Sequence, residues 1–182
     1  MMTRYVRVAI WLLAAVWLLQ ACSSPSGENG LAAAFDPEDP KEYGIRGIYL
    51  GQNIKEAMEQ LQPTKADFMD AVTRESYTAD QLAAGAGTMV MGLLLVDETQ
   101  LMVTVKQGVL HSIVVGGIPR EKAAAFATNR GLAAYDGPEK IQQLYGQAAG
   151  QSQEITLQGS KYKLLLRLHD NQLIGYRFDT VE

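Results

Sequence analysis

The chain has 182 residues, with 16 Lys and Arg against 20 Asp and Glu, and a formal net charge of −4. This length suits one domain or two small ones, and the acidic balance argues against nucleic acid as a partner. A single cysteine excludes an internal disulfide. Stability must therefore come from a packed core, for which 47% hydrophobic residues suffice.

The N-terminus has the order of a secretory signal peptide. Arg4 and Arg7 precede an apolar run from Val8 to Leu19, and no Asp or Glu occurs before Cys22. A positive segment followed by a short apolar one is typical of exported precursors. The run is shorter than the about 20 residues that a transmembrane helix needs. A signal peptide over residues 1–21 is therefore favoured over a permanent span.

A lone cysteine closes this segment. The residues leading up to it resemble the lipobox of bacterial lipoproteins, with Gln20 as a departure, and they are Leu19, Gln20, Ala21 and Cys22. The resemblance implies cleavage after Ala21, a diacylglyceryl group on the Cys22 sulfur and an acylated new amine, which together hold a chain on a membrane. Ser23, in place of an Asp, implies the outer membrane in a cell that has one, with the chain facing the periplasm.

Residues 22–43 are expected to be a lipidated, flexible tether. The stretch from Ser23 to Pro40 contains three prolines, two glycines and several small or acidic residues, a composition typical of linkers. Such a segment would hold a folded body away from the membrane surface.

Beyond the tether, one arrangement occurs twice, in a unit at 44–117 and another at 118–182. The stretches from Gly47 to Leu61 and from Gly131 to Tyr145 each combine a glycine, a short extended apolar piece, a polar turn and a helical apolar stripe. Three strand-like runs separated by turn residues follow each helix. Those runs are 88–96, 101–106 and 109–115 in the first unit, and 154–158, 161–169 and 172–179 in the second.

Further helices are expected over 64–75 and 119–129. No helix separates consecutive strands of either group, so the predicted fold class is α+β, with two tandem units that each end in a three-stranded antiparallel meander.

This organisation resembles the outer-membrane assembly lipoprotein E (SmpA/OmlA) family, and its duplicated form is similar to the β-lactamase inhibitor protein fold. The stretches GIYLGQNIKEAMEQL and GLAAYDGPEKIQQLYG carry the resemblance, which covers roughly residues 44–182. It implies a binding module on an exported scaffold, without naming the ligand.

No catalytic or metal-binding pattern is present in the sequence. His111 and His169 lack an H-x-x-x-H or C-x-x-C partner, and no G-x-S-x-G nucleophile motif occurs. We therefore expect no enzymatic activity, no cofactor and no metal.

Strand alternation predicts a basic sheet face. In the run that ends at His169, Lys163 and Arg167 share the side opposite the leucines. Arg177 on the next run is expected on this basic side, and Ile174 on the core side. Four polar residues of this face are candidates for binding an acidic protein, phospholipid headgroups or an anionic cell-wall polymer: Lys163, Arg167, His169 and Arg177. The alternative is an ordinary solvated face.

The run from Met89 to Val96 is apolar on both faces, which predicts that both faces are covered. The helices of the first unit can cover one face, and packing of the second unit is expected to cover the other. The alternative is an adaptable binding face built on Met89, Met91 and Met102.

Together these patterns predict a non-enzymatic outer-membrane lipoprotein that binds another envelope protein as an assembly or accessory factor. The alternative is an inhibitor of a periplasmic or extracellular hydrolase. Such an inhibitor would present aromatic anchors at the rim of the sheet, for which Tyr77 and Tyr135 are the candidates.

Overall fold

The computed structural model describes residues 30–147 and 152–181. The predicted signal peptide, Cys22 and the first residues of the predicted tether lie outside these ranges. The chain divides into two units, 1–33 and 34–182, and the fold described below is that of the second. None of its described helices combines the length and the apolar character needed to cross a bilayer.

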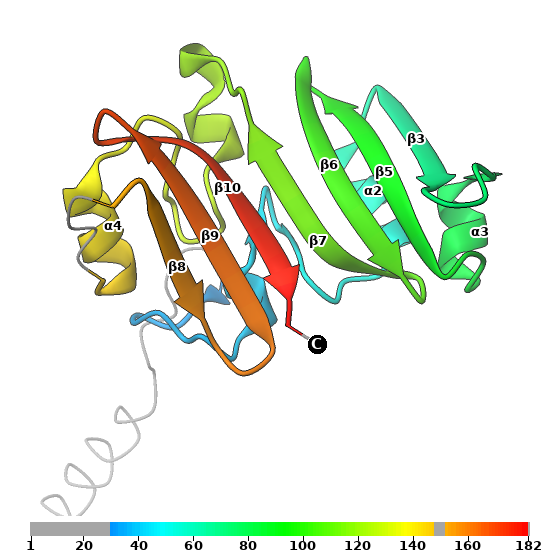
Figure 1. The fold of residues 1–182 in the computed structure, drawn as a ribbon, viewed down its shortest axis with the longest axis horizontal. Helices are drawn as coiled ribbons and strands as arrows, with labels where there is room; N and C mark the ends of the chain where they lie inside the picture. The colour runs from blue at the N-terminus through cyan, green and yellow to red at the C-terminus, as the bar shows by residue number, and fades with distance from the viewer. Residues whose placement is uncertain (1–29, 148–151, 182) are drawn as a thin grey trace, which may run out of the picture. The chain divides into compact units, whose positions relative to one another are not determined.

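One eight-stranded antiparallel sheet forms the body of this unit, in the order β4-β3-β5-β6-β7-β10-β9-β8 (Figure 1). The strands are β3 (Lys65–Asp70), β4 (Ser76–Tyr77), β5 (Met89–Val96), β6 (Thr99–Lys106), β7 (Val109–Gly116), β8 (Glu154–Gln158), β9 (Tyr162–His169) and β10 (Gln172–Thr180). A separate hairpin pairs β1 (Gly44–Ile45) with β2 (Ile48–Tyr49). Mixed helix and antiparallel sheet make the fold α+β, as the sequence predicted.

All six strands of the two predicted meanders form within a few residues of the expected positions. The meanders do not stack on each other. They join edge to edge, because β7 pairs with β10 from Gly116↔Gly175 to Ser112↔Asp179. The expectation that the second unit covers the outer face of the first is therefore wrong.

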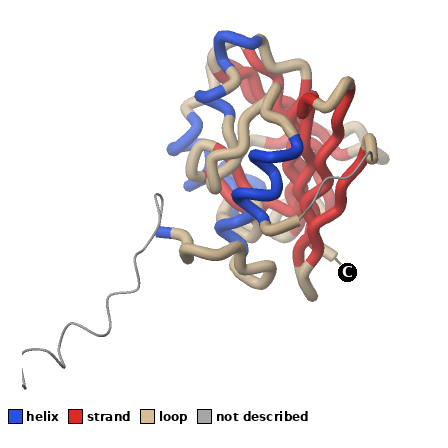
Figure 2. The backbone as a smooth tube through the Cα atoms, turned by 90° about the vertical axis from the view of Figure 1, so that its left-hand side faces the viewer, coloured by secondary structure: helices blue, strands red, loops and turns tan. Residues whose placement is uncertain are grey.

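The helices lie on one side of this sheet (Figure 2). They are α2 (Ile54–Leu61), α3 (Ala79–Ala83) and α4 (Pro138–Tyr145), with the short 3₁₀ turns η2 (Pro40–Glu42), η3 (Arg120–Lys122) and η4 (Ala124–Phe126). We call the side that carries them the covered face, and the other side the open face. The hydrophobic core lies between the sheet and these helices.

Local residues set the ends of the two amphipathic helices. The Asn53 side chain accepts a hydrogen bond from the Lys55 backbone N–H and so caps α2, while Pro138 occupies the first turn of α4. Both helices end at a residue in the left-handed conformation, Gln62 after α2 and Gly146 after α4.

The other two predicted helices are wrong. Residues 64–75 form β3 and a turn, because β3 pairs along its own whole length with β5 and buries Phe68 against the core. The Asp70 carboxylate then accepts two backbone hydrogen bonds, which fix the turn that follows. Residues 119–129 form only the 3₁₀ turns η3 and η4, with Phe126 buried. Long-range pairing and packing override local helix propensity in both places.

Residues 34–43, the second half of the predicted tether, pack against the folded body. Glu42 is fully buried and forms an ion pair with Arg130, whose guanidinium also donates to the Ala34 carbonyl oxygen at 3.0 Å. Tyr43 is buried as well, and its hydroxyl donates to the Pro37 carbonyl oxygen at 2.9 Å. A buried carboxylate is stable only when it is paired, so this contact holds the segment in place.

Candidate functional site

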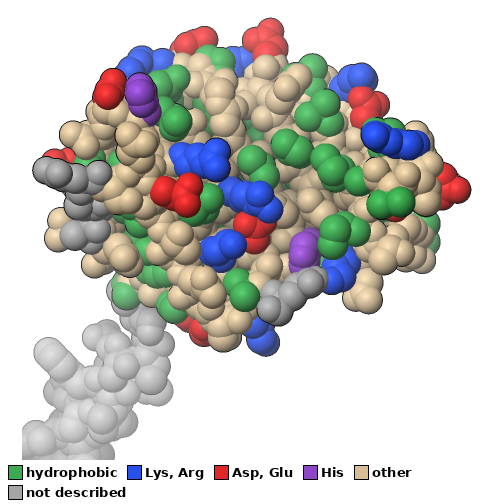
Figure 3. Space-filling model, in the orientation of Figure 1, with side chains coloured by type: hydrophobic (Ala, Val, Ile, Leu, Met, Phe, Trp, Pro, Cys, Tyr) green, Lys and Arg blue, Asp and Glu red, His purple; other side chains and the backbone are tan. Residues whose placement is uncertain are grey.

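The open face of the sheet is apolar over its first half. Five large apolar side chains from three neighbouring strands are each 41–46% exposed, and we call them the methionine patch: Met69 on β3, Met89, Met91 and Leu93 on β5, and Met102 on β6. Register places Met69 beside Met91 and Leu93 beside Met102. In Figure 3 hydrophobic side chains gather over this part of the sheet.

The second half of the open face carries a cluster of cations. Lys163 and Arg167 on β9, with Arg177 on β10, project on the side opposite the buried leucines, which confirms the predicted alternation. Figure 3 shows Lys and Arg side chains gathered over these strands, with carboxylates among them. The role of these residues in binding stays a prediction.

Two carboxylates organise this cluster. Asp179, whose side chain is only 14% exposed, lies 2.8 Å from the Arg177 Nε and 3.9 Å from the Lys163 Nζ. Glu154 on β8 lies 3.6 Å from the Arg167 Nε. Three cations therefore share two carboxylates, which leaves the cluster with a positive excess.

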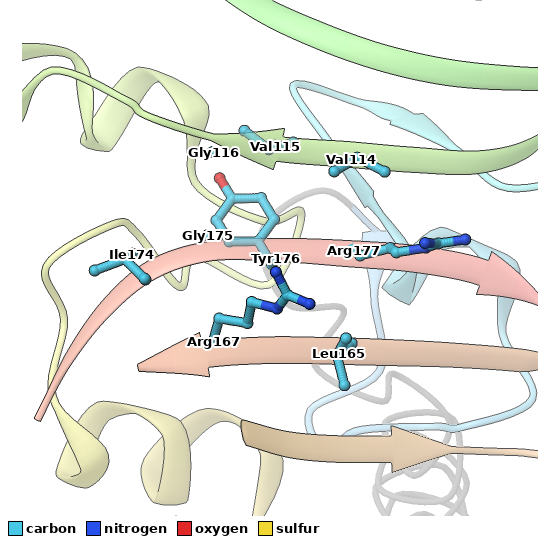
Figure 4. Close-up of a pocket in the computed structure, with 9 residues that line it drawn as sticks. All are labelled: Val114, Val115, Gly116, Leu165, Arg167, Ile174, Gly175, Tyr176 and Arg177. Atoms are coloured by element: carbon cyan, nitrogen blue, oxygen red, sulfur yellow. The ribbon is translucent and has the colours of Figure 1, made fainter. Parts of the chain in front are cut away.

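A hollow lies beside the cations, where β7 meets β10. Gly116 and Gly175 form a cross-strand pair, so neither strand supplies a side chain there. The hollow has a volume of about 290 Å³, and Figure 4 shows Arg167 reaching from β9 toward β10 at its side. The other side chains around it include Val114, Leu165, Ile174 and Arg177.

The two glycines of the hollow differ in the space around them. A Cβ at Gly175 would lie 2.8 Å from the Val115 carbonyl oxygen, so this position requires a glycine. A Cβ at Gly116 would meet nothing within 4 Å. The hollow can therefore be filled from Gly116 without disturbing the backbone.

Ile174 corrects the sequence prediction. It was expected on the core side of β10, but it lies on the open face and is 46% exposed. The register between β10 and β9 shifts between Leu173 and Gly175, and this bulge reverses the alternation for one residue. The shift adds an apolar wall to the hollow.

His169 stands apart from the hollow. It lies at the end of β9 with its ring Nε2 3.5 Å from the Asp170 carboxylate, and it is not among the residues that line the depression. His111 shares a hydrogen bond with Thr180. Within the described ranges, no three His, Cys, Asp or Glu side chains gather as a metal site would require.

A wider groove of about 710 Å³ lies along β3 and β5, and most residues of the methionine patch are among those that line it. Tyr77 lines it, but its hydroxyl donates to the Glu75 carboxylate at 2.7 Å, and this bond raises the pKa of Tyr77. The Tyr135 hydroxyl donates to the Ile118 carbonyl oxygen at 2.7 Å. Both predicted aromatic anchors are therefore held by contacts within the chain.

Sequence reasoning missed the hollow, and it gave the exposure of the methionine patch only as the alternative. The available signal for the hollow was Gly175 inside one predicted strand and Gly116 directly after another, because a glycine in a strand often marks a bulge or a missing side chain. Which two glycines face each other depends on the β7–β10 pairing, and no local pattern specifies that pairing.

No protein-family model matches this chain, and no curated protein matches it. Among solved structures, the chain is similar to an extracellular protein containing a SCP domain from Bacillus anthracis str. Ames, at 12% sequence identity and a TM-score of 0.33. The similarity covers 81% of this chain and 47% of that one, so the chain spans about half its length. At this TM-score the similarity establishes neither a shared fold nor a shared function.

Proposed function

We propose that the protein is a non-enzymatic lipoprotein of the outer membrane that binds another envelope protein through the open face of its sheet. The observation that carries this proposal is the methionine patch, whose five side chains are each 41–46% exposed on adjoining strands. A contiguous exposed apolar patch of this kind marks an interaction site in folded proteins. Methionine side chains adapt to the shape of a partner, which suits such a surface.

The membrane part of the proposal rests on the sequence around Cys22. Its lipobox resemblance supports a lipid anchor and a location on the periplasmic face of the outer membrane. With residues 34–43 packed on the body, the free linker would be shorter than the predicted tether.

We also propose that the two helix-plus-meander segments are tandem copies. The order of α2 before β5, β6 and β7 matches the order of α4 before β8, β9 and β10, with β3, β4 and α3 as additions in the first copy. A glycine and a short apolar stretch precede the helix in both copies.

An assembly or accessory factor fits better than an inhibitor of a hydrolase. An inhibitor needs anchors that are free to enter an enzyme cleft, whereas Tyr77 and Tyr135 are hydrogen-bonded within the chain. The open face offers a broad apolar surface instead.

Site-specific photo-crosslinking in living cells tests the proposal. A photoreactive residue at Met91 in the full chain should capture one envelope protein identifiable by mass spectrometry, whereas the same residue at Glu59, on the exposed side of α2, should not. In parallel, Cys22→Ala should release the chain from the membrane fraction. Equal capture from both positions would contradict binding through the open face, and unchanged fractionation of Cys22→Ala would contradict the lipid anchor.

A further inference from the structure

We infer that the partner contributes an amphipathic segment, with one apolar side chain in the Gly116–Gly175 hollow, a carboxylate on Arg167 and Arg177, and the rest of its apolar stripe on the methionine patch. This inference rests on the proposed function and specifies the chemistry of the partner.

The hollow provides the first part of the argument. Its floor is the backbone of a glycine pair, and Val114, Leu165 and Ile174 give it apolar walls. A depression of about 290 Å³ with these walls has room for one large apolar side chain. Burial of such a side chain is favourable because it removes apolar surface from water. The hollow thus selects an apolar group at a fixed place on the face.

The two guanidinium groups provide the second part. The Arg177 Nε donates a hydrogen bond to the Asp179 carboxylate. The ion pair of Arg167 with Glu154 is also made by Nε. The terminal nitrogens of both groups make no hydrogen bond to another residue in the described part of the chain. Guanidinium donors favour carboxylates, which they can bind through two parallel hydrogen bonds. The positive excess of the cluster therefore favours an acidic group next to the apolar one.

Strand register provides the third part. A line of paired residues crosses β5, β6, β7 and β10 on the open face. Each residue pairs with the next one along the line, in the order Leu93, Met102, Val114 and Arg177. Three strand spacings make this line about 14 Å long. A helix covers that distance in about nine residues, so apolar residues spaced at i, i+3 and i+7 with an Asp or Glu at one end would match it.

A lipid surface fits the same face less well. Asp179 and Glu154 stand among the cations, and Asp67 lies beside Leu93 at the apolar end. The positive excess of the cluster would attract anionic headgroups at one end of the line, but the apolar end, where Lys65 pairs with Asp67 at 2.7 Å, gives them no such attraction. A folded segment can place its own carboxylate at the cationic end and its apolar side chains at the other.

Two synthetic helical peptides with the same leucine stripe, one carrying Glu and the other Lys at its end, serve as probes. Their binding to the full chain in phosphatidylcholine vesicles is measured by fluorescence anisotropy, with empty vesicles as the blank. The Glu peptide should bind at least about tenfold more tightly than the Lys peptide, because matched charges across an interface set specificity.

Two sets of variants locate the binding. The double change Arg167→Gln and Arg177→Gln should weaken the Glu peptide about tenfold and abolish its advantage over the Lys peptide. The matched double change Lys41→Gln and Lys55→Gln alters the net charge equally on other elements, and should leave affinity within about twofold. Gly116→Leu should fill the hollow and weaken the Glu peptide about tenfold while the melting temperature stays the same.

Equal affinity for the two peptides, or an affinity that Gly116→Leu leaves unchanged, would overturn the inference. Displacement of the Glu peptide by phosphatidylglycerol vesicles would assign the site to lipid and overturn it as well. Capture of an envelope protein from Met91 together with any of these three results would mean that the protein-binding proposal holds and only the partner chemistry is wrong.

Discussion

Leu93 and Leu94 are neighbours in the sequence and in β5, yet their surroundings are opposite. Leu94 is fully buried on the covered face, whereas Leu93 is 46% exposed on the open face. The strand itself is equally apolar on both sides. The apolar composition of β5 therefore indicates a strand in the middle of a sheet. It does not indicate which side is covered, because that depends on where the helices pack.

The covered face joins both meanders into one core. Buried residues from β5, β6 and β7 belong to the same cluster as those from β9 and β10, and the Tyr176 hydroxyl on β10 donates to the Phe126 carbonyl oxygen in η4. The open face shows the opposite behaviour, because its apolar and cationic halves stay distinct. The contacts that stabilise the fold thus lie on the covered face. The side chains of the open face can therefore differ in character from one half of the sheet to the other.

The largest expected contrast lies between two single substitutions on β5. Leu94→Ala should lower the free energy of unfolding by about 2–5 kcal/mol, since it leaves a cavity in the core. Leu93→Ala should lower it by less than about 1 kcal/mol, because its side chain is already half in water. Urea denaturation of both variants measures the difference. Similar losses would mean that the open face is covered in the folded protein.

Alkaline pH should act through the covered face. Burial raises the pKa of Tyr43, of Tyr145 and of Tyr176 above the ordinary value near 10. Above that pH the unfolded chain loses protons that the folded chain keeps, so the free energy of unfolding should fall by about 1.4 kcal/mol per pH unit for each phenol. Below pH 10 this contribution is fully present.

Denaturation curves between pH 9 and pH 12 (a window of about three units around the ordinary tyrosine pKa) measure this slope. Tyr145→Phe removes one of the three phenols and should make the slope shallower by about a third. Its control is Tyr49→Phe, because the Tyr49 side chain is only partly buried. A slope unchanged by Tyr145→Phe would show that this hydroxyl is not buried in the folded state.

Local features of the fold could be predicted from the sequence, whereas features that depend on long-range pairing could not. Alternation in β9 correctly placed Lys163 and Arg167 opposite the leucines, because a regular strand has a strict period of two residues. The bulge at Ile174 interrupts that period, and the neighbouring Gly175 is a local signal of it that alternation alone does not take into account. β3 was mistaken for a helix because its pairing with β5 lies outside any local window.

Only part of the candidate site could be predicted from the sequence, because the rest depends on long-range pairing. Its cations follow from alternation within single strands, so Arg167 and Arg177 could be assigned to one face. The hollow between them depends on Gly116 facing Gly175 across the joint of the two meanders. The exposure of Met91 depends on the same joint, because edge-to-edge pairing leaves the open face without a cover.

The smallest expected effect concerns the cations of the open face. Arg167→Gln should change the free energy of unfolding by less than about 0.5 kcal/mol, because its contact with Glu154 is exposed and long. Arg177→Gln should cost slightly more, since Asp179 is mostly buried and would keep only Lys163 at 3.9 Å. Reversal to Arg177→Glu should cost the most of the three, because it places a second carboxylate beside Asp179.

Urea denaturation at low and high salt measures this series, and salt should reduce the loss in Arg177→Glu by screening the repulsion. Arg167→Gln could instead lower the free energy of unfolding as much as Leu94→Ala does. That result would mean that the side chains of the open face stabilise the fold, and it would contradict the proposal that they form a binding surface.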